Sequence, residues 1–244
     1  MNEYTENDIV VMVNNFIAKN SPELLYKQGF VNYRGKTKDT GEYYTEVIAR
    51  ELIKKDFVGQ LGKIASINRD NYNAGHSPNT KCVNIQSNRI EENIAFALYN
   101  ASKIFGITFG RLGQIIDYQV PLKATRKNAG VGKIDLISKT KDEIWLIELK
   151  YYKSKDKQSS RNTLLKAALE IATYYQQLNK KNFINSYEEF SGYRQDQIRK
   201  AVLIFDEDNI NEEYLQLKSC NMPLLKHLLK RLDVSIFVIS ITGI

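Results

Sequence analysis

The stretch GKIDLISKTKDEIWLIELKYY, residues 132–152, decides the fold. It holds two short apolar segments on either side of the polar residues 139–143, a pattern that predicts a β-hairpin. If the tight turn pairs residue 140 with residue 143, counting outward along the two strands places Asp135 directly opposite Glu148. The hairpin therefore brings together two carboxylates that are 13 positions apart in the chain.

Directly opposed side chains in an antiparallel pair have Cβ atoms about 4.5–5.5 Å apart, so Asp135 and Glu148 are expected to repel each other. Side chains alternate along a strand, which puts Lys150 on the same side as Glu148. Two carboxylates and an amine form a sensible set for a hard divalent cation. The competing interpretation is a surface aspartate beside an exposed Glu–Lys pair, since both patterns are common in basic proteins.

Charge is unevenly distributed along the chain of 244 residues. The net charge is +7, and residues 123–161 contain eleven basic side chains against five acidic ones. Nearly the whole positive excess therefore surrounds the two carboxylates. A basic field around an acidic centre suits a polyanionic substrate such as nucleic acid.

Hydrophobic periodicity predicts an α/β protein with a mixed sheet. Residues 59–88 are rich in Asn, Ser and Gly and are expected to form a linker with some local order. The predicted helices are 7–19, 42–55, 89–105, 162–178 and 224–232, and the predicted strands are 115–122, 134–138, 144–149, 201–205 and 234–241.

Other site types find little support in the sequence. Cys82 and Cys220 are far apart, and His76 and His227 have no ligand partner at a suitable spacing, so a zinc site is not expected. The acidic N-terminus differs from an export signal. The longest apolar run is much shorter than the roughly 20 residues that span a bilayer. We therefore expect a cytoplasmic protein that does not enter a membrane.

The order of elements and the hairpin residues resemble the PD-(D/E)XK nuclease superfamily, which has a restriction-endonuclease-like fold. Glu148-Leu149-Lys150 matches the (D/E)xK element, and Asp135 matches the first aspartate, although Ile134 stands where the family often has proline. The resemblance covers residues 89–205. It implies a mixed sheet flanked by helices in a nuclease core of residues 86–244. Residues 1–85 show amphipathic helices but no clear strand, so they are expected to form a helical N-terminal region.

Members of the superfamily usually carry a further glutamate on the helix before the sheet. Glu92 is our choice, because its helix leads directly into the first predicted strand. Glu91 is its immediate rival, and Glu46 shows a similar local pattern. The resemblance then implies that Asp135, Glu148 and Glu92 bind metal.

The implied activity is metal-dependent endonucleolytic hydrolysis of phosphodiester bonds. Mg²⁺ or Mn²⁺ is the implied cofactor, and Asp135, Glu148 and Lys150 are the implied catalytic residues. DNA is the simplest substrate, in a restriction, defence or repair setting, and RNA stays open. The candidate phosphate contacts are four basic residues flanking the hairpin, Arg126, Lys127, Lys153 and Lys155, which are equally explained as solvated loop charges.

A second class of function fits the same fold. The chain could be a non-catalytic module that binds nucleic acid or a partner, with an acidic patch that no longer cuts. The intact Asp135, Glu148 and Lys150 favour the enzyme. Because cutting both strands of a duplex usually requires two active sites, the enzyme is expected to act as a homodimer.

Overall fold

A computed structural model of the chain describes residues 4–79, 89–124, 130–152, 162–206 and 212–240. Its centre is a five-stranded sheet in the order β1-β2-β3-β4-β5. The strands are β1 (Gln114–Pro121), β2 (Lys133–Lys139), β3 (Ile144–Tyr152), β4 (Ile198–Asp206) and β5 (Val234–Ser240). The β1–β2 and β2–β3 pairs are antiparallel, whereas β3–β4 and β4–β5 are parallel. The expected mixed sheet is confirmed.

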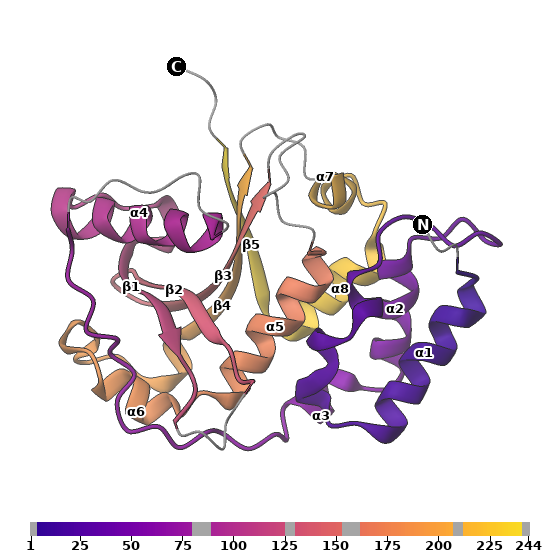
Figure 1. Cartoon of the computed structure of the whole chain (residues 1–244), viewed down its shortest axis with the longest axis horizontal. Coiled ribbons are helices and arrows are strands. Elements are labelled where there is room, and N and C mark those ends of the chain that lie inside the picture. The colour runs from indigo at the N-terminus through magenta and orange to yellow at the C-terminus, as the bar shows by residue number, and fades with distance from the viewer. Residues whose placement is uncertain (1–3, 80–88, 125–129, 153–161, 207–211, 241–244) are drawn as a thin grey trace.

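Helices cover both faces of this sheet. Parallel neighbours require a crossover connection, and α5 (Leu164–Gln177) lies between β3 and β4 in the chain, as α8 (Pro223–Leu232) lies between β4 and β5. Both pack on one face, while α4 (Ile90–Phe105) covers the other (Figure 1). The expected arrangement of a restriction-endonuclease-like α/β fold is therefore observed.

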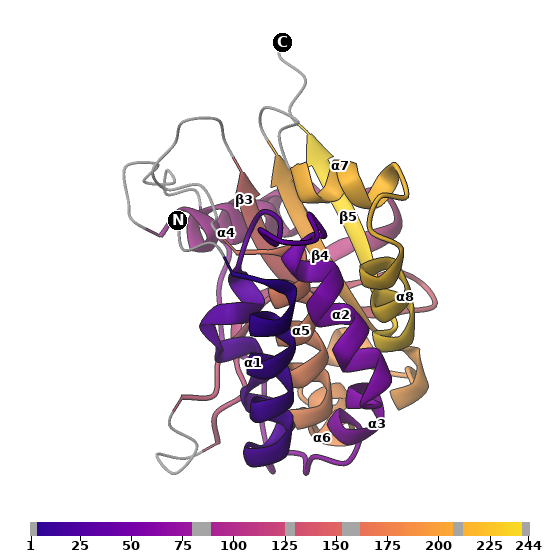
Figure 2. The ribbon, with the colours of Figure 1, turned by 90° about the vertical axis from the view of Figure 1, so that its right-hand side faces the viewer.

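The N-terminal part of the chain is helical. It contains α1 (Glu6–Lys19), α2 (Tyr44–Lys54) and α3 (Phe57–Leu61), and residues 4–79 add no strand to the central sheet. Figures 1 and 2 show these helices beside α5 and α8. Their apolar side chains share one core with α5 and α8. The boundary expected at residue 85 lies outside the described residues.

Shorter helices complete the described structure. The α-helices α6 (Lys180–Asn185) and α7 (Glu212–Lys218) were not expected from periodicity, because fewer than two helical turns give too short a pattern to recognise. The 3₁₀ helices are η1 (Pro22–Lys27), η2 (Gly29–Asn32), η3 (Gly110–Leu112), η5 (Glu188–Phe190) and η6 (Gln195–Gln197).

The expected linker contains a segment that is firmly anchored. Tyr72 is fully buried, although its neighbours Asn71 and Asn73 are exposed. Ala74 and His76 contact Asp117 on β1, where a register shift between Ile115 and Asp117 interrupts regular pairing with β2. This segment therefore packs against the edge of the sheet next to the hairpin.

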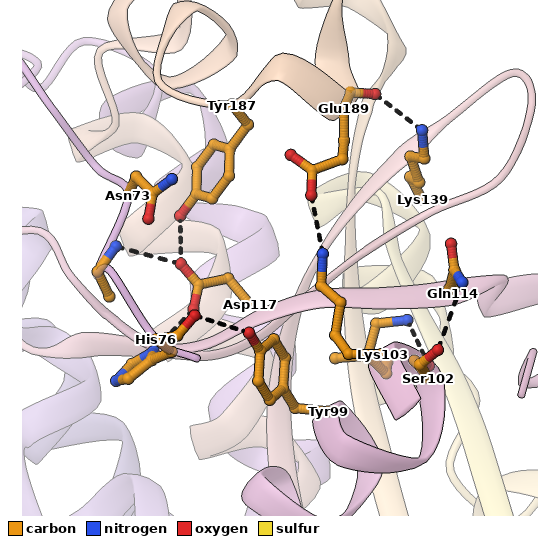
Figure 3. Close-up of polar contacts among 12 residues, drawn as sticks. Asn73, His76, Tyr99, Ser102, Lys103, Gln114, Asp117, Lys139, Tyr187 and Glu189 are labelled. Atoms are coloured by element: carbon orange, nitrogen blue, oxygen red, sulfur yellow. Dashed lines mark hydrogen bonds and ion pairs between the residues drawn. The ribbon is translucent and has the colours of Figure 1, made fainter. Parts of the chain in front are cut away.

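Asp117 holds the anchored segment in place (Figure 3). Its carboxylate accepts hydrogen bonds from Ala74 N at 3.2 Å and from the Tyr187 hydroxyl at 2.8 Å, and it lies 2.8 Å from His76 Nδ1. The His76 ring stacks on Tyr118 with a centroid separation of 4.0 Å. His76 is thus part of a packed polar cluster, within a segment that has no regular secondary structure.

Candidate active site

The central hairpin has the expected register. Thr140 N donates to Glu143 O at 2.9 Å across the turn, and the paired residues run from Lys139↔Ile144 to Leu136↔Ile147. One step further brings Asp135 level with Glu148. At this position the backbone N–H of Leu149 donates to the Asp135 side chain, at 2.9 Å from Oδ2, and not to the backbone of β2.

Glu148 and Lys150 lie on the same side of β3, as strand alternation requires. Lys150 Nζ donates to Glu148 Oε1 at 2.5 Å, and the two residues are 3% and 4% exposed, respectively. Ile147 and Leu149 are buried in the core on the opposite, α4 side of the sheet. The packing of Ile147 and Leu149 thereby fixes the position of β3, which carries Glu148 and Lys150 on its other face.

The structure brings Glu91, rather than Glu92, to this pair. Glu91 Oε1 accepts from Tyr151 N at 3.2 Å, and its Oε2 lies 3.6 Å from Lys150 Nζ. Glu92 instead lies 3.5 Å from Arg89 Nη1, and its side chain is 39% exposed. Successive helical residues point about 100° apart, so only one of two adjacent glutamates can face the sheet.

Glu46 has a separate structural task. Its two carboxylate oxygens accept from Leu224 N and Leu225 N, at 3.0 and 2.6 Å, in the first turn of α8. An acid at this position satisfies helix N–H groups that have no partner within the helix. Among the three glutamates considered from sequence, Glu91 is therefore the one that contacts Lys150.

Burial perturbs both hairpin carboxyls. It raises the pKa of Asp135 to about 6, and it raises the pKa of Glu148 well above the usual range, an effect that the nearby Asp135 increases. Burial alone would lower the pKa of Lys150, but Glu148, Glu91 and Asp135 together raise it well above its ordinary value. Acidic groups outnumber the one lysine, so the site favours an additional proton or cation.

A fourth acid was missed by sequence reasoning. Glu170 on α5 raises the pKa of both Asp135 and Glu148, and it accepts a hydrogen bond from the Tyr174 hydroxyl at 2.8 Å. That hydroxyl sits against Gly132 so closely that a Cβ on the glycine would lie 1.8 Å from it. The sequence has no local signal for Glu170, because its place depends on how α5 packs against β3.

The donor set fits a hard divalent cation. Asp135 and Glu148 present carboxylate oxygens, the ligands that Mg²⁺ prefers, and the backbone carbonyl between Glu148 and Lys150 is the expected third ligand. Within the described residues, no three His, Cys, Asp or Glu side chains form a ready-made cluster for a metal ion. The Lys150 ammonium is the cation that contacts Glu148 in this structure.

The expected nucleic-acid contacts lie elsewhere in the chain. Arg126 and Lys127 belong to residues 125–129, and Lys153 and Lys155 belong to residues 153–161, both outside the described residues. Their role stays a prediction.

A comparison with known families covers the segment that contains this site. The model of the PD-(D/E)XK nuclease superfamily matches residues 116–214, a segment that contains β2, β3 and all three hairpin residues. The resemblance inferred from the sequence is thus confirmed over the matched segment. Comparisons with curated proteins and with solved structures gave no significant match. Among the described helices, none has the length and apolar character needed to cross a membrane.

Proposed function

We propose that the chain is a metal-dependent endonuclease that hydrolyses phosphodiester bonds in DNA. The observation that carries the proposal is the contact of Lys150 with Glu148 and Glu91, next to the Asp135 carboxylate, within a nuclease-superfamily segment. A restriction, defence or repair role fits such an activity. The superfamily itself supports a nuclease acting on nucleic acid.

Asp135 and Glu148 would hold Mg²⁺ or Mn²⁺, together with the Leu149 carbonyl. When bound, the ion would supply Lewis acidity, which polarises the scissile phosphate and makes water a better nucleophile. Glu91 contacts Lys150 and the β3 backbone, so we assign it the role first considered for Glu92.

Lys150 would act as a cation rather than as a base in the resting site. Because the surrounding carboxylates raise its pKa, the ammonium keeps its proton at neutral pH. A protonated amine can orient an attacking water by hydrogen bonding and neutralise charge that develops on the phosphate. It acts mainly in the transition state, so its loss should reduce kcat more than substrate affinity.

The basic residues around the hairpin would bind the phosphate backbone. If they do, log affinity should fall with log salt by about 0.9 for each phosphate neutralised on duplex DNA. Replacing both Lys153 and Lys155 by Ala should reduce this slope by about one to two. An unchanged slope, measured by fluorescence anisotropy, would place the phosphate contacts elsewhere.

Double-strand cleavage by subunits with one site each predicts a homodimer. Light scattering with and without DNA tests this proposal, and a monomer under both conditions would contradict it. The alternative on the same fold is a module that binds nucleic acid or a partner without catalysis.

The decisive assay incubates the protein with supercoiled plasmid, linear duplex, single-stranded DNA and RNA. Each substrate is tested with Mg²⁺, with Mn²⁺ and with EDTA. Internal cleavage of DNA that requires metal would support the proposal, and preferential cleavage of RNA would correct the substrate. Binding without cleavage in every metal condition would support the binding module instead.

A further inference from the structure

Gln119 on β1 makes direct contact with the Asp135 carboxylate. The pairs Tyr118↔Leu136 and Val120↔Ile134 flank it, so Gln119 and Asp135 face each other across the two strands. Gln119 Nε2 donates to Asp135 Oδ1 at 2.8 Å, while Leu149 N donates to Oδ2 at 2.9 Å. Each carboxylate oxygen is therefore held by a donor from a different strand.

The backbone at Gln119 is strained. Its φ angle is +47°, in the left-handed region that glycine adopts easily and that a glutamine side chain disfavours. The pairing register with β2 is the same before and after Gln119, so the departure from extended backbone geometry is confined to this residue. Strained residues of this kind persist where the surroundings enforce them, and they cluster at functional sites.

A neutral amide is suited to orienting this carboxylate. Lysine at the same place would fix the carboxylate but would also neutralise its charge and compete with a cation. The glutamine amide fixes the orientation and leaves the negative charge available. Hydrogen-bonding partners of metal-binding carboxylates typically control metal affinity in this way.

We propose that Gln119 is a positioning residue that orients Asp135 for a divalent cation. This inference rests on the proposed function, because it assigns Asp135 to metal binding. The strained backbone occurs at the same residue that donates the hydrogen bond to Asp135. In this role Gln119 acts through Asp135 and does not touch the substrate. No sequence motif identifies it, since the contact depends on strand register and on the local backbone conformation.

The test compares Gln119→Met, which keeps side-chain length but removes the donor, with Gln119→Gly, which also relieves the strain. Gln60→Met is the matched control, because the Gln60 amide donates to Lys55 O at 2.7 Å far from the hairpin in the chain. Apparent Mn²⁺ affinity is measured from the metal-dependent rise in melting temperature, and cleavage is measured as separate kcat and KM values.

Both Gln119 variants should bind Mn²⁺ about tenfold more weakly than wild type, and kcat should fall with little change in KM for DNA. In EDTA, Gln119→Gly should melt higher than Gln119→Met because glycine accepts the left-handed backbone. The control should match wild type in metal affinity and kcat.

Wild-type metal affinity and kcat in Gln119→Met would overturn the positioning role and leave the proposed function standing. A lower melting temperature with unchanged metal affinity would also overturn it, since that outcome indicates a purely structural bond. If wild type itself neither binds Mn²⁺ nor cleaves DNA, the proposed function and the inference both fail.

Discussion

Asp135→Asn should make the metal-free protein more stable at neutral and alkaline pH. The pKa of Asp135 is about 6 in the folded chain against an ordinary value of 3.8. Ionising such a carboxyl costs the folded state roughly 3 kcal/mol, which the neutral amide avoids. Asparagine offers one oxygen to two donors, so about 1 kcal/mol is lost again. The remaining gain of roughly 2 kcal/mol corresponds to a rise in Tm of roughly 4–8 °C.

The predicted stabilisation by Asp135→Asn depends on pH. Because the folded pKa is raised, the penalty in wild type is absent below the unfolded pKa and complete above the folded pKa. The gain in Tm of Asp135→Asn over wild type should therefore be largest above pH 6 and be lost as the pH approaches 4, where only the cost of the lost hydrogen bond remains. Differential scanning fluorimetry in EDTA across this range measures it.

Asp117→Asn is the matched control on the neighbouring strand. The buried Asp117 carboxylate accepts several hydrogen bonds, so its replacement should lower Tm at every pH. Saturating Mg²⁺ should raise the Tm of wild type but not of Asp135→Asn. An Asp135→Asn protein that melts below wild type in EDTA above pH 6 would refute the argument that burial of this charge is costly.

Three further predictions follow from the same contacts. Lys150→Ala should lower Tm in EDTA, because it leaves the buried Glu148 carboxylate unpaired, and Mg²⁺ should restore Tm but not cleavage; retained cleavage would contradict the role of the lysine. Glu91→Gln should reduce cleavage by about tenfold or more while Glu92→Gln stays near wild type, and the reverse result would support Glu92. Gly132→Ala should lower Tm by roughly 4 °C or more through collision with the Tyr174 hydroxyl, whereas Gly29→Ala, which meets nothing within 4 Å, should not; equal effects would refute the close approach.

The hairpin was predictable because its information is local. Five consecutive polar residues define the turn, and the two-residue alternation of the strands then fixes which side chains share a face. The observed register agrees with this reasoning from Lys139 to Leu136. The charged pair on β3 follows from the same alternation, since Glu148 and Lys150 are two residues apart.

The rotation of α4 was harder to predict. Its most obvious apolar stripe includes Ile90, Ile94 and Ile104, and Ile104 is 39% exposed. The face that packs on the sheet carries Ala95, Leu98 and Ser102, which are all buried. Glu91 precedes this series by one helical turn. The less apolar stripe of Ala95, Leu98 and Ser102 therefore indicates the buried face of α4, and this face distinguishes Glu91 from Glu92.

Contacts between distant segments carried no sequence signal. Gln119 meets Asp135 through a strained backbone, and Glu170 reaches the site through the packing of α5. Tyr72 lies in a stretch that looks like a linker, yet it is buried and its hydroxyl accepts from Asn179 N at 3.0 Å. Each of these positions depends on tertiary packing that short-range periodicity does not encode.

The cleavage rate of Glu148→Gln, measured beside wild type on the same DNA with saturating Mg²⁺, tests the central claim most directly. The substitution keeps the shape of the side chain and removes the charge that the site needs. The account predicts an unchanged fold by circular dichroism and a loss of rate of at least about a hundredfold. Cleavage at the wild-type rate would contradict the assignment of the hairpin as the active site.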